Sequence, residues 1–453
     1  MISEMYNTVF NKARLSGIRV VPENAPSLYQ ECVKAFVAEV NRTNKNGKRI
    51  SELQFLPTAA LVNIFEEICK YPSLRGVLRQ ELSDPVLFMR IFTGHSSHQL
   101  TVDRCLREAS LSGKPVLPDL SRNYCDMVRQ DPLPVGSSLY MSRILGALKL
   151  GTFLHEAGWA ASSVDVLSIA KDMISSIEDN RFHDQLKREC MQQLLRAQTS
   201  CMATEEADHT CETLLSLIED VSDVGVLVKS FLQVANHHYI AERVDQCHEW
   251  ALKTMSLITD STPMDDVIEV LQLEALFCFS KQRYDLGNML ISQAIHRARS
   301  HYGTPHRRYA DVLQTYGQCL LQMNAISDAI STFVELLDVT TQLYGRLTPH
   351  VPVIQGHIAV GLYLKSQATG RFDMALQHIE DAITMAHQLT PSNRQVTEHL
   401  ATIRTLVLKG HDAALAATKE SKPTKAANYQ RFSFSEIREK YFELDASFEA
   451  MAC

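Results

Sequence analysis

The sequence predicts an all-α fold, a solenoid of stacked helix pairs. A pattern of the form small-x-x-x-apolar-x-x-small recurs along much of the chain at a spacing close to forty residues. Gly and Pro residues, which end one helix and begin the next, lie between the copies. The composition suits a folded protein, because 45% of the 453 residues are hydrophobic and 21% are charged.

The pattern is present in six copies that keep one register. A single copy is weak support, because any amphipathic helix can show it, but regularly spaced copies indicate a repeat protein. Successive copies begin 44, 40, 40, 42 and 46 residues apart. Their first residues are Ser163, Ala207, Cys247, Gly287, Ala329 and Ala375. We therefore expect about six helix pairs between residues 141 and 410.

One unit shows both of its expected helices. Between Leu313 and Leu336 the chain reads LQTYGQCL and then AISTFVEL. This order of small and apolar residues resembles the tetratricopeptide repeat, in which two antiparallel helices approach closely at small residues. The period exceeds the roughly 34 residues of the standard repeat and resembles the kinesin-light-chain type. HEAT and armadillo repeats fit this order poorly, and WD40 blades need short alternating strands.

Loops between successive pairs carry a second repeated mark. Tyr302-Gly303 and Tyr344-Gly345 each precede a Pro-His pair, and the two marks are 42 residues apart. Turns inside the pairs are expected around Gly158, Gln282 and Gly370.

The first 140 residues lack the repeat and predict a separate N-terminal helical adaptor segment. From residue 27 to residue 36 the chain reads SLYQECVKAF. Leu28, Cys32 and Phe36 are four residues apart, so a helix brings them to one face. After a polar linker, Pro57 begins a second predicted helix within FLPTAALVNIFEEI, with Leu61 on its apolar face.

These two stretches resemble an elongin-binding box followed by a cullin 2-type box. Proteins with both boxes are substrate receptors of cullin–RING ubiquitin ligases. The resemblance implies that Leu28 inserts into a pocket on elongin C, with Cys32 and Phe36 packed beside it. A chance amphipathic match is the alternative, and the ordered second box favours the functional interpretation.

The second box is implied to select the cullin. Leu56 and Pro57, together with Leu61, would contact cullin 2. A cullin 5-type box would carry a second proline at the position of Ala59. The implied partners are therefore elongin B, elongin C and cullin 2.

From Leu145 to about Gly410 the chain resembles the amyloid protein-binding protein 2 family. The motifs that carry the resemblance are LGTFLHEAGW, ARSHYG, GRFDMA and LTP. The family implies a substrate receptor of the elongin BC–cullin 2 ligase that captures C-terminal tails of other proteins, notably tails that end in glycine. It also implies association with microtubules and with trafficking of the amyloid precursor protein.

The C-terminal part departs from that family, which continues with further repeats beyond the position of Gly410. Here residues 411–453 contain an alanine-rich stretch, a Lys/Ser/Pro linker and an amphipathic helix-like end from Phe432 to Phe448. We expect three regions: an adaptor segment at 1–140, a solenoid at 141–410 and a divergent linker and helix at 411–453.

Charge and cysteine usage exclude several classes of protein. The formal net charge of -7 argues against a nucleic-acid-binding surface. The eleven cysteines form no C-x-x-C pair, so we expect no metal site. Most lie in apolar helical stretches, as reduced core cysteines do. With no signal peptide and no membrane-spanning stretch in the sequence, we expect a cytoplasmic and nuclear protein, with association to the cytoskeleton or to membranes as a further expectation.

The sequence contains no recognisable catalytic machinery. Phosphate-binding loops, dinucleotide-binding turns and nucleophile elbows are absent from it. His155-Glu156 and His237-His238 lack the spacing of metal-binding histidines and are predicted to be exposed or to pack between helices. We therefore predict a protein that is not an enzyme and needs no cofactor.

Peptide capture would use the concave face formed by the first helices of the pairs. Lys229, Asn236, Gln314 and Gln318 are predicted to point toward that face. Lys229 or another cation could pair with a terminal carboxylate, and amides could bond an extended backbone. Solvated polar positions are the alternative for these four. The second function that remains open is a cargo adaptor between membrane proteins and microtubule motors, which has no use for the elongin and cullin boxes.

Overall fold

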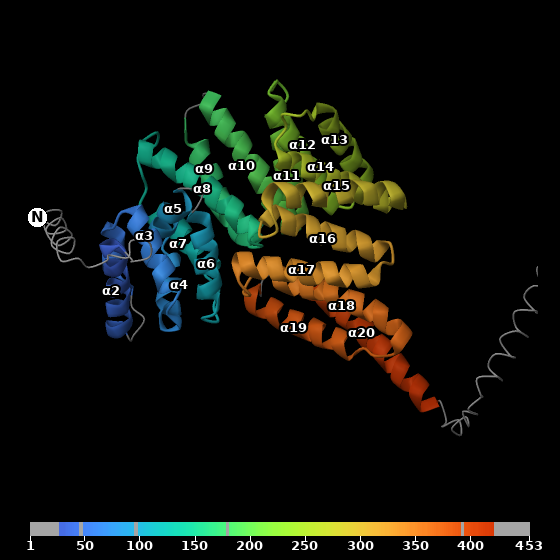
Figure 1. The fold of residues 1–453 in the computed structure, drawn as a ribbon. Helices are drawn as coiled ribbons and strands as arrows, with labels where there is room; N and C mark the ends of the chain where they lie inside the picture. Colours follow the sequence, from blue (N-terminus) through green and yellow to red (C-terminus); the bar gives the residue numbers. More distant parts are fainter. Residues whose placement is uncertain (1–26, 45–48, 95–97, 178–180, 391–393, 421–453) are drawn as a thin grey trace, which may run out of the picture.

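The computed structural model describes residues 27–44, 49–94, 98–177, 181–390 and 394–420 (Figure 1). Every element of regular secondary structure in these ranges is a helix, which confirms the predicted all-α class. The predicted C-terminal helix at 432–448 lies outside the described residues.

The N-terminal adaptor segment is a cluster of short helices. Ser27 caps helix α2 (Leu28–Thr43), because its side chain accepts from the N–H of Gln30 and the Gln30 side chain accepts from the N–H of Ser27. The elements are α2 (Leu28–Thr43), η1 (Ser51–Phe55), α3 (Thr58–Ile68), η2 (Pro72–Leu74), α4 (Arg75–Leu82), α5 (Pro85–Phe92), α6 (His98–Ser110) and α7 (Leu117–Gln130).

The solenoid follows as antiparallel helix pairs. They are α8 (Ser138–Glu156) with α9 (Ala160–Ser175), α10 (Arg181–Ser200) with α11 (Thr204–Ser216), α12 (Val224–Ile240) with α13 (Val244–Leu257), α14 (Met264–Ser280) with α15 (Tyr284–Tyr302), α16 (Arg307–Gln322) with α17 (Ile326–Tyr344), and α18 (His350–Thr369) with α19 (Asp373–Leu389). A final helix, α20 (Arg394–Glu420), packs on α18 and α19 and continues through residue 410.

The six small residues that set the register all lie on second helices and are buried. Close approach explains their size. The Ser163 hydroxyl donates to the Gly151 carbonyl oxygen of the paired helix at 2.7 Å. At Gly317 the ring of Phe333, which is fully buried, occupies the space that a side chain would need. The spacing of the small residues thus marks the points at which the two helices of each pair pack most closely.

Adding a methyl group at Gly317 should therefore destabilise the protein. A Cβ at this position would lie 2.6 Å from Cε1 of Phe333. We expect Gly317→Ala to lower the free energy of unfolding by about 1–3 kcal/mol, the cost of overpacking a tight core. The matched control is Gly76→Ala in α4, where nothing lies within 4 Å of the new Cβ; it should be neutral or stabilising by up to about 1 kcal/mol. Urea unfolding measures both, and equal effects would contradict the close-packing explanation.

Five turns inside the pairs share one backbone geometry. In each, one residue has a positive φ, and the N–H of the following residue donates to the carbonyl oxygen five residues earlier, at 2.8–3.1 Å. The five residues are Gly158, Met202, Glu242, Gln282 and Asn324. The turns expected around Gly158 and Gln282 are therefore present, and the same hydrogen bond ends a first helix even where glycine is absent.

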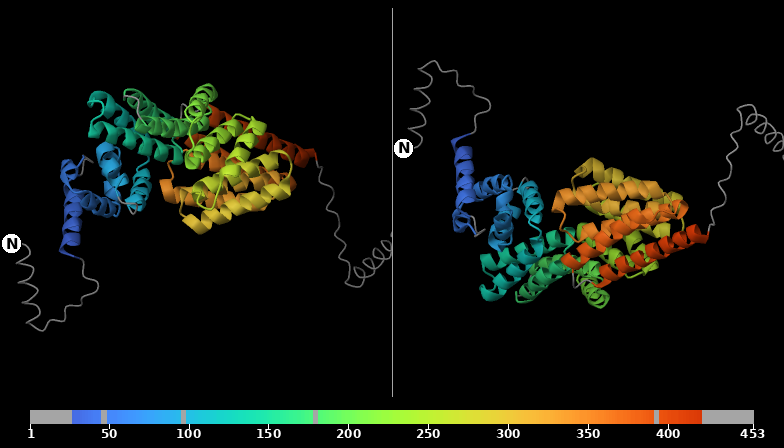
Figure 2. Two further views of the ribbon diagram at one scale, coloured as in Figure 1. Left: turned by 90° about the horizontal axis from the view of Figure 1, so that it is seen from above. Right: turned by 90° about the horizontal axis from the view of Figure 1, so that it is seen from below.

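The solenoid curves until its later pairs meet its first pair. Helix α17 packs beside α6 of the adaptor segment, and the loop after α17 reaches the turn between α8 and α9 (Figure 1). Seen from above and from below, the adaptor helices lie at one end of the molecule and α20 lies at the other (Figure 2). The curvature encloses a hollow lined by the first helices of the pairs.

Candidate protein-binding site

The hollow inside the solenoid has a volume of about 660 Å³. Its walls come mainly from the turn between α8 and α9, from α10, α12, α14 and α16, and from the start of α18, and residues of α7, α20 and the end of α19 complete them. A smaller adjoining cavity of about 90 Å³ shares part of the same wall. The residues common to both are His155, Arg196, Asp311, Gln314 and His350.

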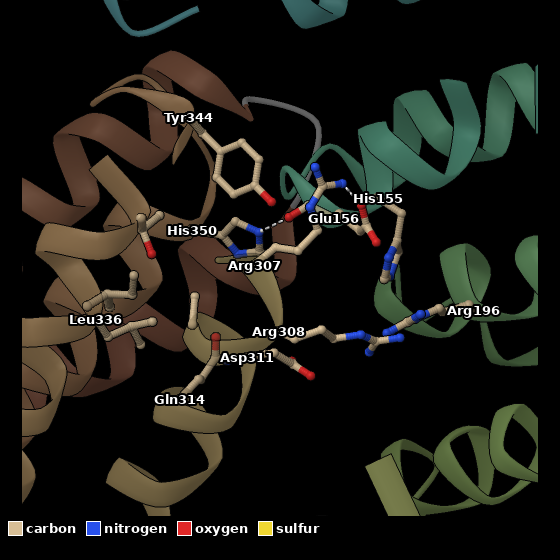
Figure 3. Close-up of a pocket in the computed structure, with 13 residues that line it drawn as sticks. His155, Glu156, Arg196, Arg307, Arg308, Asp311, Gln314, Leu336, Tyr344 and His350 are labelled. Carbon is tan, nitrogen blue, oxygen red and sulfur yellow. Dashed lines mark hydrogen bonds and ion pairs between the residues drawn. The ribbon is translucent and has the colours of Figure 1, made fainter. Parts of the chain in front are cut away.

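Three contacts between distant parts of the chain close the ring around the hollow. The Arg307 guanidinium of α16 pairs with the Glu156 carboxylate at the end of α8. The Thr348 hydroxyl donates to the Ala157 carbonyl oxygen at 2.7 Å. His350 Nε2 donates to the Glu156 carbonyl oxygen at 3.0 Å (Figure 3). We call these three contacts the clasp. Both Tyr-Gly loops of the sequence lead directly into it.

Basic side chains gather beside the clasp. Arg308 lines the smaller cavity and points toward Arg196, which lines both cavities (Figure 3). Arg308 is already paired, with its Nε 2.9 Å from Asp265 Oδ1. Arg196 is half-buried and has no ion-pair or hydrogen-bond partner among the described residues. A half-buried guanidinium that is not already bonded to a carboxylate is a candidate receptor for one.

Burial fixes the charge of the histidine in this group. The pKa of His155 lies well below its ordinary value, because the ring is buried and because Arg196 adds positive charge nearby. The ring is therefore neutral near pH 7, and Nε2 shares a hydrogen bond with the Ser200 hydroxyl at 2.8 Å. His155 lines the hollow, whereas the other histidine pair marked in the sequence packs between helices: His237 is buried and bonds Asp208 at 2.7 Å.

Two of the four predicted peptide-binding residues line the hollow, namely Asn236 and Gln314. Lys229 lies outside it, exposed, at the start of α12 near Asp266. Gln318 also lies outside, with Nε2 3.4 Å from Nε2 of His357 on α18.

Arg196 was missed, although the repeat holds a signal for it. It precedes Asn236 by forty positions, one repeat period, so both occupy the same register position on successive first helices. Subtracting one repeat period from Asn236 gives the position of Arg196. A position that lines the hollow in one repeat thus indicates the equivalent position in the neighbouring repeats.

Amide side chains join neighbouring first helices along the inner wall. Each of the four contacts spans adjacent first helices at 2.8–3.4 Å. They are Gln192 to Ser230, Gln233 to Glu269, Gln272 to Thr315 and Gln318 to His357. The Oε1 atoms of Gln233 and Gln272 are buried and have no hydrogen-bond partner within the described part of the chain, and Gln272 lines the hollow. Its oxygen can accept from the backbone N–H of an extended peptide.

Burial raises the pKa of Asp266, on the inner side of α14, to about 6. The positive charge of Lys229 partly offsets the cost of burial, while Glu269 adds to it. Its Oδ2 has no hydrogen-bond partner in the structure. The carboxyl group therefore stays protonated to a higher pH than an ordinary aspartate, and the folded state binds its proton more tightly than the unfolded state.

Asp266→Asn should raise the melting temperature above about pH 6. Because the folded pKa lies above the ordinary 3.8, the stability of the parent is fully present below that ordinary value and is lost as pH rises through about 6. The gain from Asn should therefore shrink as pH falls from about 6 to about 4. Asp265→Asn, which removes a partner of Arg308, is the control and should destabilise at neutral pH. A pH-independent effect of Asp266→Asn would refute the titration.

Helix α2 of the adaptor segment presents the predicted elongin-binding side chains to the surface. Leu28 is 57% exposed, Cys32 is exposed and Phe36 is half-buried. The opposite side of α2 carries Val33 and Val37, which are buried in the core beside α3. The helix therefore has one face that is covered and a second apolar face that is open.

The cullin-type box lies next to α2, at the start of α3. Pro57 is exposed, Leu56 is half-buried, and the neighbouring Phe55 is 80% exposed. Leu61 is a correction to the sequence analysis, because it is fully buried in the core and has no surface to offer a cullin. Arg90 of α5 holds this corner by donating to the carbonyl oxygen of Leu56.

Within the described residues, no group of three or more His, Cys, Asp or Glu side chains is arranged to hold a metal ion. None of the described helices is both long enough and apolar enough to cross a bilayer.

The fold and the hollow define the class of protein, a tetratricopeptide-like helical repeat protein. The chain is similar to amyloid protein-binding protein 2 of Rattus norvegicus and of Mus musculus, with 23% identity over 404 residues in each case. The matches cover 86% of this chain and 65% of each relative, so the chain spans slightly less than two thirds of their length. No protein-family model matches the sequence.

Among solved structures, the chain resembles a Rap protein complexed with competence and sporulation factor, at 9% identity and a TM-score of 0.44. That match covers 86% of this chain and 99% of the other. The apo form of RapI has 11% identity, the same coverage and a TM-score of 0.38. BtubC from P. vanneervenii has 12% identity and a TM-score of 0.37, over 55% of this chain and 91% of that one.

Proposed function

We propose that this protein is the substrate-recognition subunit of a cullin 2–RING ubiquitin ligase. In this proposal α2 and the start of α3 bind elongin BC and cullin 2, and the hollow binds C-terminal tails of target proteins. The protein itself catalyses no step, because a receptor acts by holding the substrate near the transfer machinery. It works in the cytoplasm and nucleus.

The observation that carries the proposal is the open apolar face of α2. Leu28 and Cys32 are exposed there although the other side of the same helix is packed. Exposed apolar groups on an ordered helix mark a binding surface, and a helix laid into a groove uses anchors three or four residues apart. Phe55 and Pro57 extend the exposed apolar surface into the second box.

The closed ring supports capture of a chain end in particular. The clasp joins the end of α8 and the turn after it to the starts of α16 and α18 and to the loop before α18. These contacts leave no open gap between the two ends of the ring on that side of the hollow. An end can enter such a hollow with one strand, whereas an internal loop needs room for two. Arg196 supplies the charge that a terminal carboxylate requires, and Asn236 and Gln272 supply amides for the backbone.

Co-purification tests the assembly. The full chain should co-elute with purified elongin BC and cullin 2, and Leu28→Ala/Cys32→Ala should reduce the association about tenfold or more, because anchor side chains carry most interface energy. A variant on the packed side cannot serve as control, since it would disturb the core. Ala38→Ser, on the exposed surface of the same helix, is the matched control and should bind as the parent does.

Failure of the folded, intact chain to bind elongin BC would refute the ligase proposal. The alternative is then a cargo adaptor for intracellular transport along microtubules. The relatives' name, amyloid protein-binding protein 2, makes the tail of an amyloid precursor-type membrane protein the first cargo to test. The hollow would serve both functions, so only the binding at α2 and α3 separates them.

A further inference from the structure

Two free cysteines meet between α3 and α6, outside the hollow and outside the exposed face of α2. The sulfur of Cys69, at the end of α3, lies 3.4 Å from the sulfur of Cys105 on α6. A disulfide has an S–S bond of about 2.0 Å. Closing the bond therefore needs the two sulfurs to approach by about 1.4 Å, which side-chain rotation and small backbone shifts can supply.

The contact between these helices is fixed on both sides of the cysteine pair. The Thr101 hydroxyl donates to Glu66 Oε1 at 2.7 Å, one helical turn earlier on α6. Arg75, at the start of α4, pairs with Glu108 at 3.1 Å, one turn later on α6. Because both neighbouring turns are held, the sulfurs stay near each other as the molecule fluctuates.

The two thiols differ in access and in charge state. Cys69 is partly exposed, whereas Cys105 is 1% exposed. The hydrogen bond from the Cys105 thiol lowers the pKa of Cys69, and the same bond, with burial, raises the pKa of Cys105. The thiolate thus forms on the sulfur that solvent can reach, and the proton stays on the buried one. A reactive cysteine with an adjacent resolving cysteine has this arrangement.

The other described cysteines lack this combination. Burial raises the pKa of Cys125, Cys201 and Cys211 to about 11. Cys32 is exposed, but no second sulfur contacts it in the described part of the chain. The pair is therefore singled out by its geometry.

We propose that Cys69 and Cys105 form a reversible disulfide when the protein meets hydrogen peroxide. The Cys69 thiolate attacks one peroxide oxygen, the O–O bond breaks, and protonation of the leaving hydroxide gives water and a Cys69 sulfenic acid. The Cys105 sulfur then attacks the Cys69 sulfur, and the hydroxyl leaves as a second water with the Cys105 proton. Overall, two thiols are oxidised by two electrons and one peroxide is reduced to two waters.

The disulfide would join α3 to α6, two helices with different surroundings. Helix α3 begins at the exposed Pro57, and α6 packs against α17 of the solenoid. A disulfide here closes a loop of the chain between residues 69 and 105 and so restricts the unfolded state. We expect the oxidised protein to melt several degrees higher than the reduced protein.

Peptide mapping without reductant tests the proposal on the full chain. After treatment with hydrogen peroxide and alkylation of the remaining thiols, most molecules should yield the Cys69–Cys105 cross-linked peptide. Dithiothreitol should remove both the peptide and the gain in melting temperature. Cys32→Ser, the matched control, should keep the cross-link.

Cys69→Ser and Cys105→Ala should each abolish the cross-link and the oxidation-dependent rise in melting temperature, with circular dichroism to verify that each variant is folded. Cys69→Ser changes a partly exposed side chain, so it keeps the test valid if Cys105→Ala unfolds. The proposal is overturned if the folded parent gives no such peptide while Cys32 is oxidised, or if Cys69 proceeds to sulfinic acid without linking to Cys105.

Discussion

Replacing Arg196 with Gln should weaken the binding of peptides with free C-termini about thirtyfold or more. Arg196 is the half-buried guanidinium in the hollow that lacks a partner among the described residues. Removing one partner of a desolvated charge pair costs about 2–5 kcal/mol, and the lower end of that range corresponds to about thirtyfold in affinity. Gln keeps hydrogen-bonding capacity and most of the volume, so the charge is what changes.

The measurement uses fluorescence anisotropy with a library of labelled peptides and the same library amidated at the C-terminus. The parent should prefer the free carboxylate, and Arg196→Gln should lose that preference, which separates charge recognition from general loss of binding. Arg122, at the rim of the hollow, is exposed and already pairs with Asp119 at 3.3 Å. Arg122→Gln is therefore the control and should change affinity little. Equal binding of free and amidated peptides by the parent would exclude carboxylate capture.

Breaking the clasp at Glu156 should produce the largest loss of stability. Glu156→Ala leaves the Arg307 guanidinium, whose side chain is 21% exposed, without its carboxylate. Removing one member of such a buried pair costs about 3–5 kcal/mol, because the remaining charge stays desolvated. The carboxyl of Asp103 compensates only partly, because it acts on the Arg307 guanidinium more weakly than Glu156 does.

Urea unfolding of three variants tests this explanation. Glu156→Ala should shift the midpoint strongly, and Glu156→Leu with Arg307→Met should recover much of the loss, because no uncompensated charge remains. Glu39→Ala removes an exposed ion pair on α2 and should leave the midpoint nearly unchanged. If the double variant unfolds as readily as Glu156→Ala, the loss comes from packing and not from the unpaired charge.

The repeat register could be predicted from the sequence because it depends on local chemistry. A second helix can approach its partner only where side chains are small, so Ser163 and Ala329 mark the contact wherever the fold places the pair. The shared face of Leu28 and Cys32 was predictable for the same reason, because four-residue spacing brings the two side chains together on any helix. The capping box at Ser27 fixes where that helix begins.

Residues whose role depends on the opposite side of a helix were harder to assign. Leu61 and Leu56 belong to one short apolar stretch, but the structure buries Leu61 completely and leaves Leu56 half-exposed. Apolar character alone does not tell a core position from a docking position, because both favour the same residues. Polar residues are equally hard to assign from sequence. Lys229 lies outside the hollow because of where α12 begins relative to the neighbouring helices, and that offset cannot be read from the sequence.

The sequence alone determined that this chain is a stack of helix pairs and that Leu28 and Cys32 share one face of an N-terminal helix, because periodicity and small residues are local properties. Only the tertiary structure decided that the solenoid closes on itself, that Glu156 meets Arg307 across 151 positions of sequence, and that Arg196 faces the enclosed hollow. The physical reason is that small rotations between successive pairs add up along a solenoid. No single repeat encodes their sum, and the sum decides which distant side chains meet.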